Sequence, residues 1–331
     1  MRAMILAAGF GTRMRPVTYT LPKMLVPVCN RPLIGWAVET FLRAGIRDLV
    51  VNLHHFPEAI EQYLPANYDA DFHFSFEAAI LGTGGGIKRV QSLLEAEEDF
   101  IAVNGDTIQF PDYAALRRAR RERDALAAML LRHPPAGDRF TAVYAEGGEI
   151  AGFGKGHGEA FIFSGAHCIA SRVFGYLSDG FSGIVEDVYK KTDERLAAVV
   201  DDNALWFDTG TPRRLISANA SLLEATLRGA AELAKNSRID GDSILAATAR
   251  GRAVRSTVGE RSVIDGDVRD SAVWDDCLVA RGVELDRCIV AHGVALKNRG
   301  RYRDVLICRD DPAIPRDAPY LVQDGLVVAA I

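Results

Sequence analysis

The chain has 331 residues, more than the ~250–300 at which a single hydrophobic core stops growing, so we expect two domains. Its hydrophobic content of 48% and charged content of 25% are ordinary for a globular protein, and its net charge is −5. That balance gives no bulk electrostatic reason to bind nucleic acid or an anionic membrane. Any anionic ligand must therefore be held by local charge and backbone dipoles.

The cysteines and the apolar runs argue against disulfides, export and membrane insertion. The five cysteines are scattered and form no Cys-x-x-Cys pair, which predicts free buried thiols in a reducing cytosol rather than a zinc site. The apolar stretch at the N-terminus ends at Ala8, and no run approaches the ~20 apolar residues of a membrane span. We predict a cytoplasmic, soluble protein with no nucleic-acid or membrane partner.

The first thirty residues contain the most informative stretch of the chain. Met4–Ala8 is a short apolar run that ends at Gly9, which predicts a buried strand running into a tight loop. The glycines allow backbone N–H groups to face an anion, and Arg13 and Lys23 add positive charge, which suits a nucleoside triphosphate. The loop is not a Walker A motif, because no Gly-Lys-Ser/Thr follows, and it lacks the third glycine of the dinucleotide fingerprint.

Strands and helices are predicted to alternate through the next hundred residues. The predicted strands are 48–52, 71–77, 100–104 and 125–131, and the predicted helices are 32–44, 57–64, a segment following the glycines at 82–86 and ending at 94, and 111–123. This order indicates an α/β fold with a doubly wound, mostly parallel sheet. Ligands of such sheets bind at the carboxyl ends of the strands, where the Gly9 loop, Glu77, Gly82 and Asp106 all fall.

The pattern becomes less regular after residue 134. The segment 134–158 is rich in glycine, 160–168 predicts another strand, and 181–187 predicts a loop leading into a helix. A short strand at 205–208 and a helix over 213–233 complete the first domain. We place the boundary near Lys235, which gives the domains 1–235 and 236–331.

Beyond this boundary apolar residues recur every five or six positions, from Val258 to Val294, near glycine, aspartate or serine. The spacing predicts imperfect hexapeptide repeats, each forming one short strand of a left-handed parallel β-helix of roughly three turns. A small irregular β-sandwich is the alternative, because the spacing slips. So short a coil buries little surface alone, so we expect it to pack on the first domain or on another copy of the chain as a homo-oligomer.

The amino-acid sequence of residues 6–28 resembles that of a known enzyme family. The segment 6–16, LAAGFGTRMRP, followed by 21–28, LPKMLVPV, closely resembles the start of the sugar-1-phosphate nucleotidylyltransferases, which make nucleoside-diphosphate sugars. The resemblance implies a Rossmann-like nucleotidyltransferase domain, and several family members carry a left-handed β-helix after it. It also implies that the glycine loop wraps the triphosphate, that Arg13 and Lys23 steady it, and that two aspartates hold Mg²⁺.

Asp106 and Asp208 stand in segments, NGD and WFDTGTP, that resemble the family's two metal-binding segments. Two carboxylates with phosphate oxygens completing the shell suit Mg²⁺, which prefers hard oxygen ligands. The alternative is that each aspartate caps the helix that follows it. The resemblance implies that Arg13, Lys23 and Asp106 are catalytic, and that Asp106 and Asp208 are the metal ligands.

The segment 81–86, LGTGGG, resembles the family's loop over the base and ribose, and Glu77 stands where family members read the base edge. Guanine offers two adjacent N–H donors to one carboxylate, whereas uracil offers a single donor, so Glu77 favours GTP. Uridylyl enzymes of this type also show glutamate here. The nucleotide-binding residues implied by the resemblance are Leu6, Ala7, Ala8, Gly9, Gly11, Thr12, Arg13, Glu77, Gly82, Thr83, Asn104 and Gly105.

The sugar side carries a weaker pattern. Lys155 falls where the family contacts the sugar phosphate, but glycines replace the usual Glu-Lys-Pro, so a solvated surface lysine is the alternative. Ser164, Gly165 and Glu186 fall where the family contacts sugar hydroxyls.

The resemblance implies transfer of a nucleotidyl group from an NTP, with GTP favoured, to mannose 1-phosphate or a related sugar 1-phosphate such as a heptose phosphate. One alternative is a uridylyltransferase acting on N-acetylmuramate 1-phosphate or glucose 1-phosphate. Another is a non-catalytic regulatory subunit that binds nucleotide sugar, although such relatives would be expected to lose one of Arg13, Lys23, Asp106 and Asp208. An acyltransferase site in the coil would have only one histidine, His292, to use.

Overall fold

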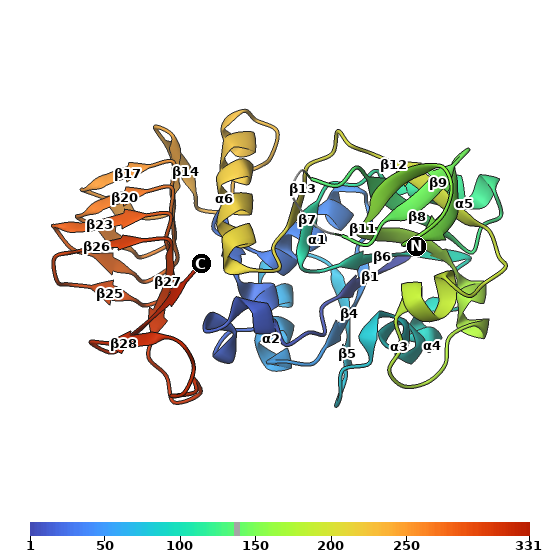
Figure 1. Cartoon of the computed structure of the whole chain (residues 1–331), viewed down its shortest axis with the longest axis horizontal. Helices are drawn as coiled ribbons and strands as arrows, with labels where there is room; N and C mark the ends of the chain where they lie inside the picture. The colour runs from blue at the N-terminus through green and yellow to red at the C-terminus, as the bar shows by residue number, and fades with distance from the viewer. Residues whose placement is uncertain (136–139) are drawn as a thin grey trace. The chain divides into compact units, whose positions relative to one another are not determined.

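The structure is a computed structural model, and it describes residues 1–135 and 140–331. The chain forms two compact units, one of residues 1–10 and 34–206 and one of residues 11–33 and 207–331 (Figure 1). The first unit holds the predicted sheet, and the second joins the segment carrying Arg13 and Lys23 to the C-terminal part. The domain boundary near Lys235 stays a prediction. Within the described residues no helix has the length and apolar character needed to cross a membrane.

The first unit is built on a nine-stranded sheet of order β5-β4-β1-β6-β11-β8-β12-β10-β9. Its strands are β1 (Arg2–Leu6), β4 (Asp48–Leu53), β5 (Asp71–Phe76), β6 (Asp99–Asn104), β8 (Ala127–Arg132), β9 (Val143–Glu146), β10 (Glu149–Phe153), β11 (Glu159–Ala170) and β12 (Leu196–Val200). Strands β5, β4, β1 and β6 run parallel, β12 runs parallel to β8, and β11 runs antiparallel to β6 and β8. The predicted α/β fold with a mostly parallel sheet is confirmed.

The helices of this unit follow the predicted alternation. They are α1 (Leu33–Arg43), α2 (Pro57–Asn67), α3 (Gly82–Arg89), α4 (Gln91–Leu94) and α5 (Tyr113–Glu122). The α3–α4 segment buries Ile87, Val90 and Leu94 in one cluster with Met4 of β1 and Val50 of β4. This contact packs the glycine-rich helix against the strands that lead to the predicted ligand edge.

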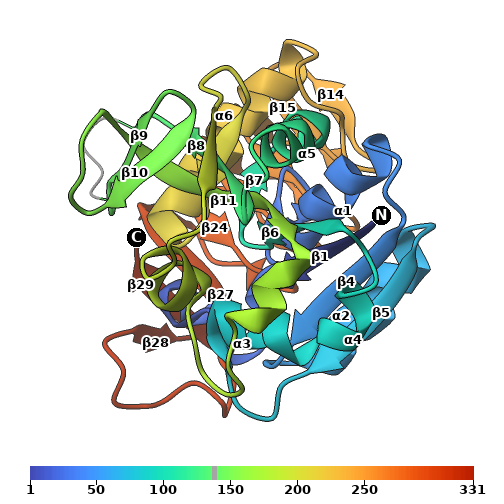
Figure 2. The ribbon, with the colours of Figure 1, turned by 90° about the vertical axis from the view of Figure 1, so that its right-hand side faces the viewer.

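The segment 134–158, whose sequence pattern is less regular, contains two strands that the pattern did not predict. Strands β9 and β10 form an antiparallel hairpin, and its turn residues Gly147 and Gly148 both have positive φ. Figure 2 shows the two strands side by side at the edge of the sheet. The glycines serve the turn, and residues 136–139 of the segment lie outside the described residues. Strand β12 is a further element that the sequence pattern did not predict.

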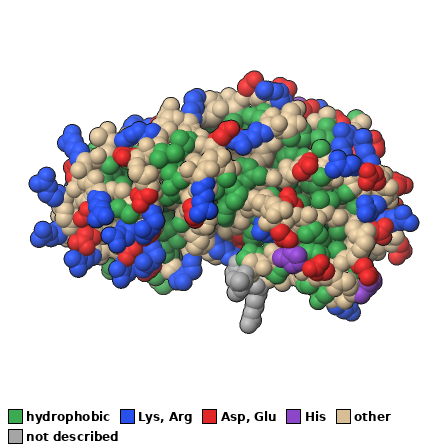
Figure 3. Space-filling model, turned by 90° about the horizontal axis from the view of Figure 1, so that it is seen from above, with side chains coloured by type: hydrophobic (Ala, Val, Ile, Leu, Met, Phe, Trp, Pro, Cys, Tyr) green, Lys and Arg blue, Asp and Glu red, His purple; other side chains and the backbone are tan. Residues whose placement is uncertain are grey.

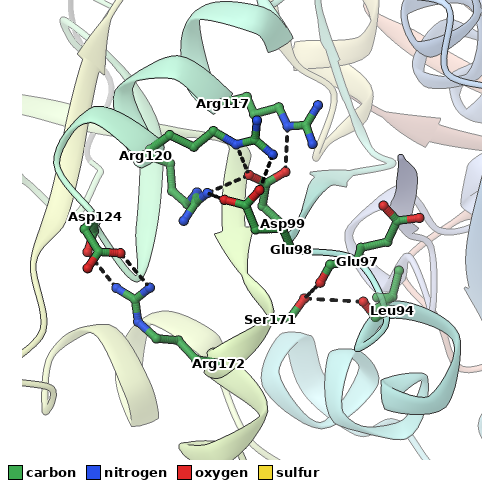
Figure 4. Close-up of polar contacts among 10 residues, drawn as sticks. Leu94, Glu97, Glu98, Asp99, Arg117, Arg120, Asp124, Ser171 and Arg172 are labelled. Carbon is green, nitrogen blue, oxygen red and sulfur yellow. Dashed lines mark hydrogen bonds and ion pairs between the residues drawn. The ribbon is translucent and has the colours of Figure 1, made fainter.

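A buried ionic cluster fastens β6 to α5. Asp99 is fully buried, and its carboxylate accepts hydrogen bonds from Arg117 (2.7 Å), Arg120 (2.7 Å) and Arg121 (2.8 Å) (Figure 4). Burial alone raises the pKa of Asp99, but the hydrogen bonds from Arg121 and Arg117 outweigh it, so that the pKa lies below its ordinary value. Glu98 also accepts from Arg120 (2.6 Å), on the exposed side of the cluster.

The second unit joins an N-terminal hairpin to α6 (Pro212–Leu227) and the C-terminal strands. The hairpin pairs β2 (Pro27–Val28) with β3 (Arg31–Pro32). At its turn the N–H of Cys29 donates to Oδ1 of the buried Asn219 on α6 (2.8 Å). The amide of Asn30 donates to the carbonyl of Val258 in the coil (3.0 Å). Helix α6 ends earlier than the sequence predicted, so the prediction of a helix over 213–233 is too long.

Beyond α6 the chain winds into a parallel β-helix. One sheet includes β15, β18, β21, β24 and β27, a second stacks β16, β19, β22 and β25, and a third stacks β17, β20, β23 and β26 (Figure 1). The strands of successive turns pair in parallel, which confirms the predicted coil and rules out the alternative of a β-sandwich. This pairing is in keeping with a left-handed β-helix. Four stacked strands on the second and third faces exceed the three turns expected.

The strands of this unit are short, as hexapeptide repeats require. They are β14 (Arg238–Asp240), β15 (Ser243–Leu245), β16 (Thr248–Ala249), β17 (Arg252–Val254), β18 (Thr257–Val258), β19 (Val263–Ile264), β20 (Asp267–Arg269), β21 (Ala272–Val273), β22 (Leu278–Val279), β23 (Val283–Asp286), β24 (Ile289–Val290), β25 (Ala295–Leu296), β26 (Gly300–Arg303), β27 (Val305–Arg309), β28 (Leu321–Gln323) and β29 (Leu326–Ala330).

The corners of the coil explain its uneven spacing. The buried hydroxyl of Ser256 accepts the N–H of Ser271 (3.1 Å), and that of Ser271 accepts the N–H of Cys288 (2.9 Å). These partners are 15 and 17 residues apart, which is the slip seen in the sequence. Arg255 and Asp270, which precede members of this column, have positive φ at their corners. Basic side chains, with acidic ones among them, crowd the surface of the coil (Figure 3).

Candidate active site

The carboxyl end of β1 forms the centre of the candidate site in the first unit. Leu6, its last residue, pairs with Asn52 of β4 and Asn104 of β6. The N–H of Ala7 donates to Oδ1 of Asn52 (2.8 Å), and the N–H of Gly105 donates to the carbonyl of Leu6 (2.9 Å). The structure therefore brings together predicted nucleotide-binding residues from β1 and β6, which are far apart in the sequence.

Glu77 lies at the same edge, but its carboxylate faces the protein. The side chain is only 4% exposed. One oxygen accepts the amide of Asn52 (2.7 Å), and the other accepts the N–H of Leu81 (2.9 Å). Reading a base edge would require Glu77 to release one of these donors. The predicted base contact stays a prediction, and the geometry gives the argument for GTP from this residue no support.

The glycines 82–86 form the first turns of α3, not a loop that precedes a helix, which corrects the predicted position of the helix start. The loop that carries Ser182 lies against them, since the Ser182 carbonyl accepts the N–H of Gly84 (2.8 Å) and Thr83 Oγ1 accepts the N–H of Ile184 (2.9 Å). A Cβ at Gly85 would lie 2.0 Å from the carbonyl oxygen of Gly180. The glycine run therefore has a packing reason of its own.

Two of the predicted sugar-contacting residues lie beside Asn104. Ser164 and Gly165 interrupt the regular pairing of β11 with β8, and Gly165 has a φ of +93°. A Cβ at Gly165 would lie 2.8 Å from Nδ2 of Asn104. Ser164 is 3% exposed, and its hydroxyl has no hydrogen-bond partner among the described residues. The indole N–H of Trp206 donates to its carbonyl (3.0 Å).

The other two predicted sugar contacts are exposed. Lys155 lies in the turn after β10, and Glu186 lies in a single π-helical turn, Ile184–Tyr189, where it pairs with Lys190 (2.6 Å). That turn confirms the predicted loop into a helix. Across residues 1–135 and 140–331, neither side chain makes a hydrogen bond or ion pair to Ser164. Their sugar-contacting roles stay predictions.

Two histidines of the first unit have pKa values shifted from the ordinary value of histidine. His167 of β11 is buried with a hydrogen bond to the hydroxyl of Tyr189 (2.8 Å), and burial lowers the pKa of His167 to about 3. His133 lies between Asp202 (2.7 Å) and Glu159 (2.9 Å), and hydrogen bonds to these carboxylates raise the pKa of His133.

In the second unit the segment after Gly9 is tightly folded. Gly11 has a φ of +61°, and a Cβ there would lie 2.8 Å from Cβ of Lys23. Thr18 donates to the carbonyl of Gly11 (2.8 Å), and Lys23 is only 5% exposed. The predicted pair of Thr12 and Arg13 opens the 3₁₀ turn Thr12–Met14 that follows. Gly11 and Lys23 are thus packed against each other, and their roles at the triphosphate stay predictions.

Asp208 and Arg13 come together in this unit around Gly210. The N–H of Gly210 donates to Oδ1 of Asp208 (2.7 Å), and the other carboxylate oxygen pairs with Arg214. A Cβ at Gly210 would lie 2.9 Å from the guanidinium of Arg13 and 2.9 Å from Oδ1 of Asp208. Arg214 escaped the sequence analysis, and its only signal was its place six residues after Asp208.

Neither aspartate caps the helix that follows it. Thr211 caps α6 by accepting the N–H of Arg214 (3.3 Å), and Asp112 caps α5 by accepting the N–H of Ala115 (2.9 Å). The capping alternative for Asp106 and Asp208 is therefore wrong. The described residues contain no cluster of three or more His, Cys, Asp or Glu side chains arranged to hold a metal. Mg²⁺ commonly takes only one or two carboxylates, with substrate phosphates completing its shell.

Comparison with known proteins defines the class. Residues 2–225 match the family model described as nucleotidyl transferase. The chain therefore belongs to the nucleotidyl transferase family. The resemblance seen in the first residues of the sequence is confirmed.

The relatives narrow the comparison. The chain is 28% identical over 312 residues to the probable mannose-1-phosphate guanylyltransferase 3 of Oryza sativa subsp. japonica, covering 90% of this chain and 83% of the relative. It is 28% identical over 262 residues to a mannose-1-phosphate guanyltransferase of Hypocrea jecorina, covering 70% and 67%. It is 33% identical over 147 residues to a UTP–glucose-1-phosphate uridylyltransferase of Synechocystis sp., covering 41% and 38%.

A solved structure shares the fold. HddC from Yersinia pseudotuberculosis, crystallised as a complex with GMP-PN, matches with a TM-score of 0.59 at 21% identity. The match covers 67% of this chain and 99% of that protein. At this identity the likeness supports the nucleotidyltransferase fold and nothing finer.

Proposed function

We propose that this chain transfers a guanylyl group from GTP to mannose 1-phosphate or a related sugar 1-phosphate, releasing pyrophosphate. One observation carries the proposal. The similarity to a mannose-1-phosphate guanylyltransferase covers 90% of the chain, whereas the family model ends at residue 225, so the likeness includes much of the coil. The match to the uridylyl relative covers only 41%.

The chemistry needs positioning and positive charge more than acid–base groups. A phosphate oxygen of the sugar 1-phosphate is already ionised at neutral pH and attacks the α-phosphorus of the nucleotide in line, while pyrophosphate leaves. Arg13 and Lys23 take up negative charge on the departing pyrophosphate, and backbone N–H groups of the 7–12 loop hold the remaining oxygens. Asn104 and Gly105 border the nucleotide, and Ser164 and Gly165 border the sugar.

The donor set fits Mg²⁺. Asp106 and Asp208 offer the hard carboxylate oxygens that Mg²⁺ prefers. One oxygen of Asp208 accepts the N–H of Gly210 and the other pairs with Arg214, so the Arg214 ion pair would have to open for Asp208 to take the ion. These two aspartates would hold the ion, which supplies charge neutralisation at the reacting phosphates. Their joint use by one ion is part of the proposal, since they belong to different compact units.

A uridylyltransferase acting on glucose 1-phosphate or N-acetylmuramate 1-phosphate is the second candidate. It is favoured by the 33% identity to the Synechocystis uridylyl enzyme, the highest identity among the relatives cited above, although over a shorter stretch. A non-catalytic regulatory subunit is disfavoured, because Arg13, Lys23, Asp106 and Asp208 are all present.

Release of pyrophosphate tests the substrate assignment. The purified full chain is offered GTP, UTP, ATP and dTTP with mannose, heptose, glucose and N-acetylmuramate 1-phosphates, with and without Mg²⁺. We expect the highest kcat/KM with GTP and mannose or heptose 1-phosphate, and activity that EDTA removes. A higher kcat/KM with UTP or dTTP would replace the guanylyl assignment by the second candidate, and no turnover with any pair would favour the regulatory subunit.

Substitution of Arg13 tests the role of the loop. Loss of one fixed charge-stabilising donor costs about 3–4 kcal/mol in the barrier, so we expect Arg13→Ala to lower kcat at least about a hundredfold. Arg15→Ala is the matched control, because the Arg15 guanidinium already lies over the ring of Tyr19 at 4.5 Å. Steady-state rates for both variants decide the point, and a loss below about tenfold for Arg13→Ala would dismiss its proposed role.

A further inference from the structure

Three hydrogen bonds in the first unit form a continuous network that connects two predicted nucleotide-binding segments. The N–H of Ala7 donates to Oδ1 of Asn52 (2.8 Å), and Nδ2 of Asn52 donates to Oε1 of Glu77 (2.7 Å). The N–H of Leu81 donates to Oε2 of the same carboxylate (2.9 Å). Asn52 is 3% exposed and Glu77 is 4% exposed, so this hydrogen-bond network lies in the protein interior.

The order of donors and acceptors in this hydrogen-bond network is fixed by the chemistry of the two side chains. A carboxylate only accepts, so the Asn52 group that faces it must be the NH₂, and the amide oxygen must then face Ala7. Each side chain ends on a backbone N–H, one at Ala7 after β1 and one at Leu81 before α3. Any exchange of donor for acceptor in the middle would leave two like groups facing each other in the interior.

Helix α3 lies directly against this pair. A Cβ at Gly86 would stand 2.8 Å from Nδ2 of Asn52 and 3.0 Å from Oε1 of Glu77. The last glycine of the run 82–86 therefore has a specific reason to lack a side chain. The helix start and the β1 loop are held by the same two residues.

We propose that Asn52 and Glu77 are positioning residues that set the spacing between the loop after β1 and the start of α3. This inference rests on the proposed function, because the bound group is the nucleotide. Glu77 acts through the N–H of Leu81 and through Asn52, not by contact with the base. Disturbing the pair moves the two walls of the nucleotide site relative to each other, which weakens NTP binding without changing which base is preferred.

A charge swap tests the pair directly. In Glu77→Gln the new NH₂ must face either Leu81 N–H or the Asn52 amide, and in Asn52→Asp two carboxylates face each other. Each single variant leaves a buried donor or acceptor unpaired, so we expect the KM for the NTP to rise about tenfold or more. The KM for the sugar 1-phosphate should change far less.

The double variant Asn52→Asp/Glu77→Gln restores every hydrogen bond with the central one reversed. The carboxylate at position 52 accepts from Ala7 and from the new amide at position 77, whose oxygen accepts from Leu81. We expect its KM for GTP to return to within about threefold of the parent, a residual cost of well under 1 kcal/mol. Its ratio of kcat/KM for GTP over UTP should equal that of the parent protein.

Two outcomes would overturn the proposal. If the double variant has a KM for GTP no lower than that of the worse single variant, the proposed pair is overturned. This comparison remains decisive if one single variant fails to fold, because the double variant should then fold and bind GTP. A changed GTP-to-UTP ratio in Glu77→Gln that persists in the double variant overturns the proposal in favour of base reading. Tyr113→Phe is the matched control, because it loses a buried hydrogen bond with Thr40 (2.9 Å) elsewhere in this unit and should keep its KM.

Thermal unfolding separates failure of this inference from failure of the proposed function. The double-variant cycle can be measured as melting temperatures of the full chain without any substrate. Rescue of stability by the swap supports the hydrogen-bonded pair even if the substrate panel rejects GTP. Additive losses in the two single variants, with no rescue, overturn the pair whatever the substrate is.

Discussion

The two units use pairs of arginine and aspartate in opposite ways. In the first unit Asp99 is fully buried and receives Arg117, Arg120 and Arg121 (Figure 4). In the coil Arg255 makes two hydrogen bonds of 2.6 Å to Asp270 on the next turn, but the two side chains are 57% and 26% exposed. The same two functional groups meet at similar distances in both places.

The difference between the two environments decides what each pair contributes. A buried charge has lost its hydration, so removing its partner leaves an uncompensated ion in the interior. An exposed pair keeps most of its hydration and is screened by salt, so it contributes little to stability. We therefore expect Asp99 to contribute strongly to the packing of α5 on β6. The exposed arginines of the coil should contribute little beside the hydrogen bonds of its buried serines.

Asp99→Asn should have the largest effect on stability. It removes the charge that the nearly buried Arg120 needs, and breaking a buried pair in this way costs about 3–5 kcal/mol. Urea-induced unfolding measures the loss, and hydrogen exchange in β6 and α5 assigns it to the first unit. Glu98→Gln is the matched control at a site 62% exposed, and it should change little. A loss in Asp99→Asn no larger than in this control would remove the distinction.

The Asp99 cluster should make the free energy of unfolding of the first unit depend on pH, with stability lost at acidic pH. The pKa of Asp99 lies below its ordinary value of 3.8, so the unfolded chain takes up a proton at a higher pH than the folded one. The stabilisation is complete above the unfolded value and is lost as the pH falls through the folded value. Unfolding midpoints of the parent chain and Asp99→Asn should therefore converge between pH 5 and pH 2, about the range in which a carboxyl titrates. Parallel curves would contradict the assignment.

Much of this contrast could be foreseen from the sequence, but not its decisive part. Periodicity predicted α5 and β6, and the recurrence of valines from Val258 predicted the coil, because both signals are local. The burial of Asp99 could not be predicted, because it depends on how α5 crosses the sheet. The carboxylate of Glu77 was read as a ligand group for a similar reason, since its partner Asn52 lies on another strand.

The candidate site shows the same limit. Sequence similarity to the family's motifs identified Gly11, Arg13 and Asp208, and the structure brings Arg13 and Asp208 together around Gly210. The glycine run at 82–86 was predicted to be a loop, because its sequence resembles the family's loop over the base and ribose. The run is helical in the structure, and the glycines are needed because the Ser182 loop packs too closely against them for side chains. That cause lies in the tertiary structure, so a local sequence pattern does not show it.

Ser271→Ala should have an intermediate effect in the second unit. Its hydroxyl accepts the buried N–H of Cys288 (2.9 Å), and an unpaired buried donor costs about 1–3 kcal/mol. Fluorescence of Trp274, which is buried next to this corner, can follow unfolding of the coil. Ser271→Cys is a matched variant, because the next turn already uses a cysteine here, and it should lose less. Equal losses in both variants would contradict the expectation that a thiol can replace the hydroxyl as acceptor in this column.

Asp270→Asn should have the smallest effect, although it breaks a geometrically good pair. Its hydrogen bonds raise the pKa of Arg255, yet that arginine is already charged at every working pH, so the shift adds no pH dependence near neutrality. We expect little change in the unfolding midpoint in physiological salt. Whatever difference appears at low ionic strength should vanish in 1 M NaCl, where the screening length is about 3 Å. The Asp99→Asn difference should persist there, because bulk ions do not reach the buried carboxylate. If Asp270→Asn lost as much stability as Asp99→Asn, or kept its loss in high salt, exposure could not be what separates the two kinds of pair.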